Sequence, residues 1–114
     1  MNRGTGADAE ACAAAFLESR GLTIIERNYR CRFGEIDLIA RDGATVVFVE
    51  VRARSSRAYG GAAESITPAK RKRLVAAARD YLVAQRVQCA CRFDVVLLNG
   101  ASQDVEWIAN AFGE

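Results

Sequence analysis

The alternation of hydrophobic and polar residues is clearest between Gly34 and Arg54, where it predicts a β-hairpin. Two alternating runs, 35–40 and 45–53, flank the pair Asp42-Gly43. An Asp-Gly pair between alternating runs favours a tight hairpin turn. A two-residue turn at 42–43 therefore sets the expected register of the two strands.

This register gives the hairpin one apolar face and one charged face, because successive strand residues point to opposite sides of a sheet. The apolar face would contain Ile36 and Leu38 on the first run and Val47, Val49 and Val51 on the second. The other face would contain Glu35, Asp37, Glu50 and Arg52. A shift of one residue would break both patterns, so both require the same register.

Three carboxylates on adjacent strands allow two interpretations. Like charges raise one another's pKa and oppose folding unless something neutralises them. A divalent cation would do so, since Mg²⁺ is usually held by one or two carboxylates together with a substrate phosphate. The alternative is a solvated hairpin face on which Arg52 and Arg54 act as counter-charges. Because the apolar face is strong enough to bury both strands, a site in a cleft is favoured.

The remaining patterns predict two helices and three further strands. The expected elements are a helix at 5–20, a strand with a bulge at 22–32, a loop at 55–66, a helix at 68–87 and strands at 92–98 and 105–108. A strand, a long helix and a strand in succession imply a parallel crossover. The fold class is therefore α/β, with a mixed central sheet flanked by helices.

Each predicted helix has an apolar face. On the first helix it consists of Ala9, Cys12, Ala13, Phe16 and Leu17, and on the second of Leu74, Val75, Ala78, Tyr81 and Leu82. Cys12 is thus predicted to be in the core. Glu10 lies beside the first stripe, where it would either interact with the helix dipole or lean over the sheet. Lys70 and Arg73 share another face of the second helix.

Length and composition indicate one domain of an ordinary globular protein. The chain has 114 residues, of which 51% are hydrophobic and 26% charged, enough to bury a core. It shows no membrane-span pattern and no secretory leader, so a cytoplasmic location without a membrane partner is expected. Four cysteines, at 12, 31, 89 and 91, occur without any histidine, and their spacing favours neither a zinc site nor a disulfide framework.

Charge is distributed unevenly although the net charge is only +2. From Arg52 to Arg73 there are seven basic residues and one acidic residue, Glu64. A basic middle suits a phosphate-backbone partner, but a merely basic helix end would look the same. The small-residue loop at 55–66 carries Arg57 and Tyr59, and it either closes over a nucleic-acid strand, with Tyr59 stacking on a base, or only connects two elements.

Asp37 near the end of one strand, followed by Glu50-Val51-Arg52 on the next, resembles the motif of the PD-(D/E)XK nuclease superfamily. The order αβββαβ also matches that core. More closely, nearly the whole chain is similar to the YraN family of small, nuclease-like bacterial proteins. The similar segments are the helix with Glu10, the strand around Asn28 and Arg30, GEIDLI, VFVEVR, the helix with Lys70, RFDVV and VEWIANAF.

The resemblance implies a restriction-endonuclease-like core over residues 1–114 that hydrolyses phosphodiester bonds with Mg²⁺ or Mn²⁺. Asp37, Glu50 and the carbonyl of Val51 would hold the metal, and Glu10 would be an outer or second-metal ligand. Catalysis would involve Asp37, Glu50, Arg52 and Glu10. The expected nucleic-acid contacts are Arg54, Arg57, Tyr59, Lys70 and Arg73, with DNA expected ahead of RNA. Holliday-junction resolvases share this core and work as dimers, so a homodimer is one option for this chain.

Arg52 departs from the superfamily motif, which normally has a lysine there. An arginine cannot act as a general base, although it can bind phosphate in bidentate fashion. Lys70 could supply a lysine from outside the motif. Three functions stay open at this point: a metal-dependent DNA nuclease, a nucleic-acid-binding module that no longer cuts, and a protein-interaction subunit with a salt-bridged acidic surface.

Overall fold

The computed structural model describes residues 5–54, 66–99 and 104–112. Its elements are α1 (Thr5–Ser19), β1 (Thr23–Cys31), β2 (Gly34–Asp42), β3 (Thr45–Arg54), α2 (Pro68–Gln85), β4 (Cys91–Asn99) and β5 (Asp104–Phe112). The predicted order of elements and the α/β class are confirmed, and β5 extends beyond the predicted 105–108. The result is consistent with a restriction-endonuclease-like core.

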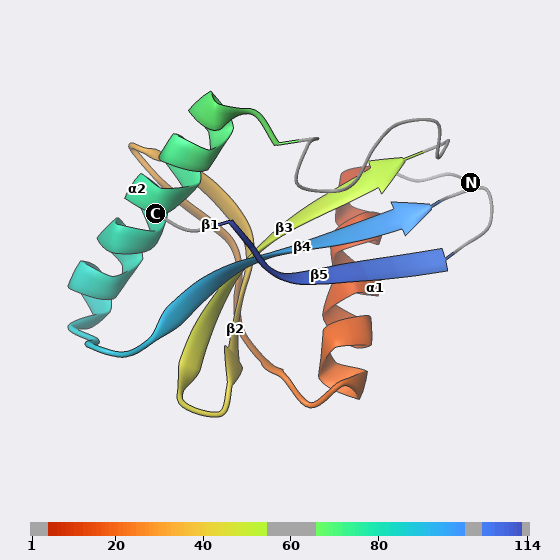
Figure 1. The fold of residues 1–114 in the computed structure, drawn as a ribbon, viewed down its shortest axis with the longest axis horizontal. Helices are drawn as coiled ribbons and strands as arrows, with labels where there is room; N and C mark the ends of the chain where they lie inside the picture. Colours follow the sequence, from red (N-terminus) through yellow and green to blue (C-terminus); the bar gives the residue numbers. More distant parts are fainter. Residues whose placement is uncertain (1–4, 55–65, 100–103, 113–114) are drawn as a thin grey trace.

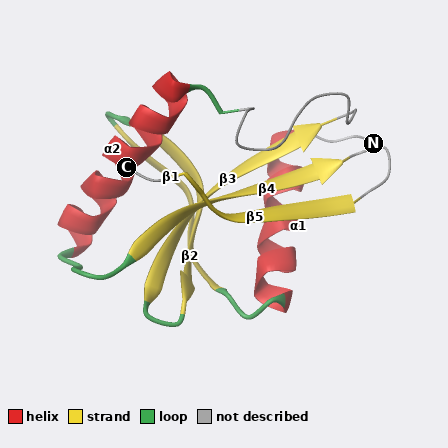
Figure 2. Cartoon of the chain, in the orientation of Figure 1, coloured by secondary structure: helices red, strands yellow, loops and turns green. Residues whose placement is uncertain are grey.

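The five strands form one mixed sheet in the order β1-β2-β3-β4-β5 (Figure 2). Neighbouring strands are antiparallel except β3 and β4, which are parallel and are connected through α2, as the crossover pattern predicts. The two helices cover opposite faces of the sheet (Figure 1). The fold is therefore a three-layer α/β/α arrangement, and neither described helix is long and apolar enough to cross a lipid bilayer.

Two hydrophobic clusters hold these layers together. On the α1 face, Ala13, Ala14 and Leu17 pack among Leu38, Ala40, Val47, Val49, Val96 and Leu98. On the α2 face, Leu74, Ala77, Ala78 and Tyr81 pack among Ile36, Ile39, Phe48, Phe93, Val95 and Leu97. Strands β3 and β4 are apolar on both faces because both faces are covered.

Burial on α1 corrects one prediction. Cys12 is exposed, so its assignment to the core is wrong, and Ala14 is buried in its place. The buried set Ala13, Ala14 and Leu17 is narrow and consists mostly of small residues. Helix α1 therefore lies close to the sheet along a stripe displaced from the one that the spacing of apolar residues suggested.

The hairpin turn lies one residue later than predicted. Strand β2 ends at Asp42, which pairs with Thr45, so Gly43 and Ala44 form the loop. Gly43 has φ of +61° and Ala44 has no positive φ, as in a type II′ turn, which needs glycine only at the first central position. The pairing of the two strands is therefore shifted by two residues from the predicted register. Odd-numbered residues of β2 still lie opposite even-numbered residues of β3, as predicted.

The chain bends in the middle of β1 and β2. The pairs Arg27–Leu38 and Tyr29–Ile36 leave Asn28 opposite Asp37, and Asn28 has φ of +54°. Asparagine tolerates this left-handed conformation better than most residues. Because of the bend, the prediction that Ile36 and Leu38 share a face is wrong: Ile36 packs under α2 and Leu38 under α1. The predicted bulge earlier in β1 is confirmed, since the register shifts between Ile24 and Glu26.

Helix α2 begins as its sequence predicts. Thr67 is the N-cap, Pro68 is the first helical residue, and the Thr67 hydroxyl accepts a hydrogen bond from the Lys70 N–H at 3.1 Å. Leu74, in the second turn of α2, is buried in the same cluster as Ile36 and Phe48, and it thereby holds this end of the helix against the sheet. The first turn is the part of α2 that reaches the candidate site.

Candidate metal centre

Asp37 lies where β2 and β3 separate. Their pairing ends at Leu38–Val49, and the next position along the two strands brings Asp37 level with Glu50. Beyond it, the Val51 N–H donates to Asp37 Oδ2 at 2.8 Å. The carboxylate thus accepts the backbone hydrogen bond that a strand carbonyl would otherwise accept. This contact fixes Asp37 between the two strands rather than on an open face.

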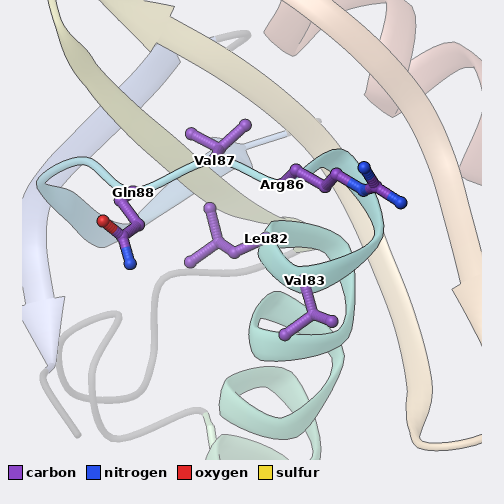
Figure 3. Close-up of a pocket in the computed structure, with 5 residues that line it drawn as sticks. All are labelled: Leu82, Val83, Arg86, Val87 and Gln88. Carbon is purple, nitrogen blue, oxygen red and sulfur yellow. The ribbon is translucent and has the colours of Figure 1, made fainter.

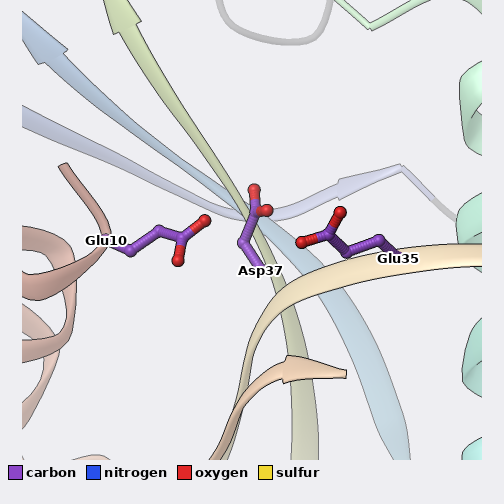
Figure 4. A group of neighbouring side chains, drawn as sticks. All are labelled: Glu10, Glu35 and Asp37. Atoms are coloured by element: carbon purple, nitrogen blue, oxygen red, sulfur yellow. The ribbon is translucent and has the colours of Figure 1, made fainter. Parts of the chain in front are cut away.

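Three carboxylates converge at this point (Figure 4). One oxygen each of Glu10, Glu35 and Asp37 can be chosen so that all three lie within 4.8 Å of one another. Glu10 comes from α1 and Glu35 from β2, and in the figure both point toward Asp37 from either side. Arg30 approaches Glu35 with Nε 3.6 Å from Oε2, an exposed ion pair that contributes little stability. Carboxylate oxygens, here one residue from α1 and two from β2, are the ligands that a hard divalent cation prefers.

The surroundings of Asp37 make its ionised form unfavourable. Burial, the largest cause, and the charges of Glu50, Glu10 and Glu35 together raise the pKa of Asp37 from 3.8 to about 7, although the hydrogen bond from Val51 acts to lower it. A bound cation would reverse the balance by stabilising the carboxylate. The donor set and this accumulation of negative charge therefore fit a divalent cation such as Mg²⁺ or Mn²⁺.

Glu50 is the buried carboxylate next to this group. Its side chain is 5% exposed, and its Oε2 lies 2.9 Å from Lys70 Nζ and 3.5 Å from Arg52 Nη1. A buried carboxylate requires a counter-charge, and here cations from two different elements supply it. The structure therefore brings Lys70 to the motif residue Glu50, which sequence reasoning raised only as an option.

The other predicted site residues have different outcomes. Val51 contributes its N–H to Asp37, and Arg73 is exposed on α2 one turn after Lys70. The backbone of Arg54 pairs with Asn99 at the end of β3. Arg57 and Tyr59 lie outside the described residues, so their predicted contacts with nucleic acid stay predictions.

Glu35 received no role from the sequence, although the alternation of polar residues placed it on the acidic face with Asp37. The structure adds it to the group formed by Asp37 and Glu10. The available signal was its position two residues before Asp37, which puts both side chains on the same side of a regular strand. The bend at Asn28 and Asp37 could not be read from that spacing.

A buried aspartate outside this group, Asp94 on β4, was missed. Arg92 Nε lies 3.0 and 3.2 Å from its two oxygens, Trp107 Nε1 donates at 2.9 Å, and the Asn110 N–H donates at 2.8 Å. Arg92 also pairs with Asp42 at 3.1 Å, and these acceptors, Asp94 foremost, hold its pKa above the ordinary value. The only hint in the sequence was one acidic residue within an apolar run.

A shallow hollow of about 440 Å³ lies at the C-terminal end of α2, the end opposite Lys70 (Figure 3). It is lined by Leu82, Val83, Arg86, Val87 and Gln88. None of these side chains is a carboxylate, so the hollow and the acidic group are separate features.

Comparison with known proteins places the chain in a family. Residues 9–98 match the family described as "Uncharacterised protein family UPF0102". The chain belongs to this family. The predicted membership of the YraN family is thereby confirmed. The matched segment of UPF0102 contains Glu10, Glu35, Asp37, Glu50 and Lys70, whereas β5 follows it.

Individual UPF0102 proteins match over most of their length. One from Nitrosomonas europaea is 60% identical over 110 residues, which cover 96% of this chain and 93% of the relative. One from Ralstonia nicotianae is 54% identical over 114 residues, covering 96% and 86%. One from Methylococcus capsulatus is 53% identical over 109 residues, covering 94% and 89%. The UPF0102 assignment therefore concerns the whole arrangement of elements around the site.

Proposed function

We propose that this UPF0102 protein is a divalent-cation-dependent nuclease that hydrolyses phosphodiester bonds in DNA. The observation that carries the proposal is the convergence of Glu10, Glu35 and Asp37 beside the buried Glu50. The resemblance of Asp37 and Glu50-Val51-Arg52 to the PD-(D/E)XK motif supports the same chemistry.

The carboxylates would hold the cation, Mg²⁺ or Mn²⁺. Asp37 is the central ligand, because it lies between Glu10 and Glu35. The negative charge of Glu50 also repels that of Asp37, and a bound cation would offset this repulsion. When bound, the cation supplies a bound water of lowered pKa and neutralises charge on the phosphate. The hydrogen bond from the Val51 N–H to Oδ2 keeps the Asp37 carboxylate oriented. The other oxygen, Oδ1, does not accept this bond.

The basic residues supply what the carboxylates cannot. Hydrolysis joins a water oxygen to phosphorus and breaks one ester P–O bond, while a proton passes from the water to the departing oxygen through solvent or a site group. Negative charge grows on the phosphate oxygens during this exchange. Arg52 and Lys70, which both contact Glu50, lie where they can stabilise that charge.

The test is a cleavage screen with Mg²⁺ or Mn²⁺ over linear duplex, single-stranded and four-way-branched DNA, with RNA as a parallel substrate. Asp37→Asn and Glu50→Gln should each reduce the cleavage rate by at least about a thousandfold, since each removes negative charge from the site that would hold the cation. Glu106→Gln, an exposed carboxylate on β5, is the matched control and should cleave as the unmodified protein does.

A second readout does not depend on finding the substrate. Mn²⁺ should raise the melting temperature of the unmodified protein, because a ligand that binds only the folded state stabilises it. The increase should be lost in Asp37→Asn. Absence of any thermal shift together with absence of cleavage on all substrates would refute the proposal.

A nucleic-acid-binding module without cleavage is the second candidate, and Arg52 in place of the usual lysine favours it. Such a module would hold DNA through its arginines and lysines, with an affinity that falls steeply as salt is added. Cleavage that disappears in Asp37→Asn would exclude it, whereas salt-dependent binding without hydrolysis would select it.

A further inference from the structure

The sequence contains two lysines, Lys70 and Lys72, and the structure treats them differently. Lys70 Nζ lies 2.9 Å from Glu50 Oε2, and its side chain is 36% exposed. Lys72, two residues further along α2, is exposed at the surface. The chain therefore directs one of its two ammonium groups to a buried carboxylate of the candidate site.

The position of Lys70 is built into the start of α2. Its N–H is held by the Thr67 side chain, and the Arg71 N–H is held by the Thr67 carbonyl at 2.9 Å. These bonds fix the backbone of the first turn, while the four-carbon lysine stem leaves the ammonium free to turn about several bonds. A fixed backbone with an adjustable charge suits a group that exchanges one anionic partner for another.

Arg52 is less suited to that exchange. It contacts the same Glu50 oxygen at the longer distance of 3.5 Å, and its guanidinium spreads the charge over a rigid plane. The ammonium of Lys70 is compact, with three donors. Of the two cations, Lys70 is the closer counter-charge of Glu50.

We propose that Lys70 is a catalytic residue, whose ammonium neutralises Glu50 in the metal-free protein and contacts the reacting phosphate when a divalent cation takes over the charge of Glu50. The inference rests on the proposed nuclease function. It gives one side chain on α2 two anionic partners in succession, first Glu50 and then the phosphate.

The proposal predicts opposite effects of one substitution. Without Lys70, Glu50 loses a cation that competes with Mn²⁺, so Lys70→Met should bind Mn²⁺ about tenfold more tightly. The same variant should cleave about a hundredfold more slowly at saturating DNA, because a positive group that stabilises the phosphate is gone. If Lys70 only supported the fold, its replacement would weaken both Mn²⁺ binding and cleavage.

The experiment measures Mn²⁺ affinity by calorimetry and the turnover number in the unmodified protein, Lys70→Met and Lys72→Met. Lys72→Met is the matched control and should leave both quantities within about twofold of the unmodified values. Lys70→Gln, which keeps a hydrogen-bond donor without the charge, should behave as Lys70→Met does and guards against a folding defect specific to methionine.

Rescue provides the sharper comparison. Adding Arg52→Lys to Lys70→Met returns an ammonium to the neighbourhood of Glu50 from β3, and it should recover at least about tenfold of the lost turnover. Unchanged turnover in Lys70→Met, weaker Mn²⁺ binding in that variant, or no recovery on adding Arg52→Lys would overturn the role of Lys70. An unmodified protein that neither binds Mn²⁺ nor cleaves would instead overturn the proposed function.

Discussion

Asp37 and Asp94 are two aspartates on neighbouring parts of one sheet, and their surroundings are opposite. Asp94 is fully buried and accepts hydrogen bonds from Arg92, Trp107 and Asn110. Within the described residues, Asp37 accepts one hydrogen bond, from Val51, and its pKa is raised by burial and by the carboxylates around it. Asp94 is thus neutralised by the protein itself, whereas Asp37 lies among side chains that carry its own sign of charge.

Both sites use the same backbone device. Asn28 lies opposite Asp37 on β1, Asn110 donates its N–H to Asp94 from β5, and each asparagine has φ of +54°. Each one interrupts regular pairing beside an acidic residue on the adjacent strand. The difference between the sites therefore comes from the side chains that surround each carboxylate and not from the local bend.

The largest effect on stability is expected at Asp94. Asp94→Ala removes the acceptor of three donor groups and leaves Arg92 without its buried partner, so the free energy of unfolding should fall by about 3–5 kcal/mol. Urea unfolding measures the change. A loss below about 1 kcal/mol would show that the network is not the internal neutralisation described here.

A smaller loss is expected when a single donor is removed. Trp107→Phe deletes the indole N–H that donates to Asp94 while keeping an aromatic ring near Phe16. The free energy of unfolding should fall by about 2 kcal/mol, the range for a hydrogen bond to a charged group. The same variant made together with Asp94→Asn should lose less than the sum of the two single changes, because the two residues share one interaction.

At Asp37 the expected change has the opposite sign. The folded protein binds a proton at Asp37 more tightly than the unfolded chain does, since the pKa is raised from 3.8 to about 7. The stability due to this protonation is present below about pH 4 and is lost as the pH rises to about 7. Metal-free Asp37→Asn should therefore be more stable than the unmodified protein at pH 8, by about 1 kcal/mol after allowance for solvent screening.

Unfolding measured from pH 4 to pH 8 in a chelating buffer tests this prediction. The unmodified protein should lose stability over that range more steeply than Asp37→Asn. If Asp37→Asn were less stable than the unmodified protein at pH 8, the ionised Asp37 carboxylate would stabilise the fold, as that of Asp94 does.

The smallest effect concerns the flanking carboxylates. Glu10→Gln removes one charge that raises the pKa of Asp37 and should lower that pKa, while burial, the largest cause, stays in place. A carbon-detected NMR titration of the Asp37 side chain measures it. Glu18→Gln, an exposed change on the same helix, should leave the pKa of Asp37 unaltered.

Much of this arrangement could be predicted from the sequence because it follows from periodicity. The spacing of valines in β3 and the Thr67-Pro68 helix start gave the sheet faces and the beginning of α2. The family resemblance pointed to Asp37 and Glu50. Periodicity does not predict where the regular pattern is interrupted. The bend at Asn28 placed Ile36 and Leu38 on different faces of the sheet, and the Gly43-Ala44 loop shifted the pairing of β2 with β3 by two residues.

Contacts between distant segments were also beyond the sequence. Arg92, Asp94 and Trp107 form their network through a bulge between β4 and β5, where the register shifts between Phe93 and Val95. The distance between Lys70 and Glu50 depends on how α2 lies across the sheet, which no local pattern specifies. Cys12 shows the same limit. It is exposed because α1 packs on the sheet through Ala13, Ala14 and Leu17, and the spacing of apolar residues did not specify this side of the helix.

The hydrogen bond from the Val51 amide to Asp37 makes that amide a natural spectroscopic reporter. Its proton resonance should follow the ionisation of the carboxylate near neutral pH and should respond again when a cation draws electron density from the same oxygens. One backbone signal in an isotope-labelled sample would thus record the state of the site without any substrate or inhibitor.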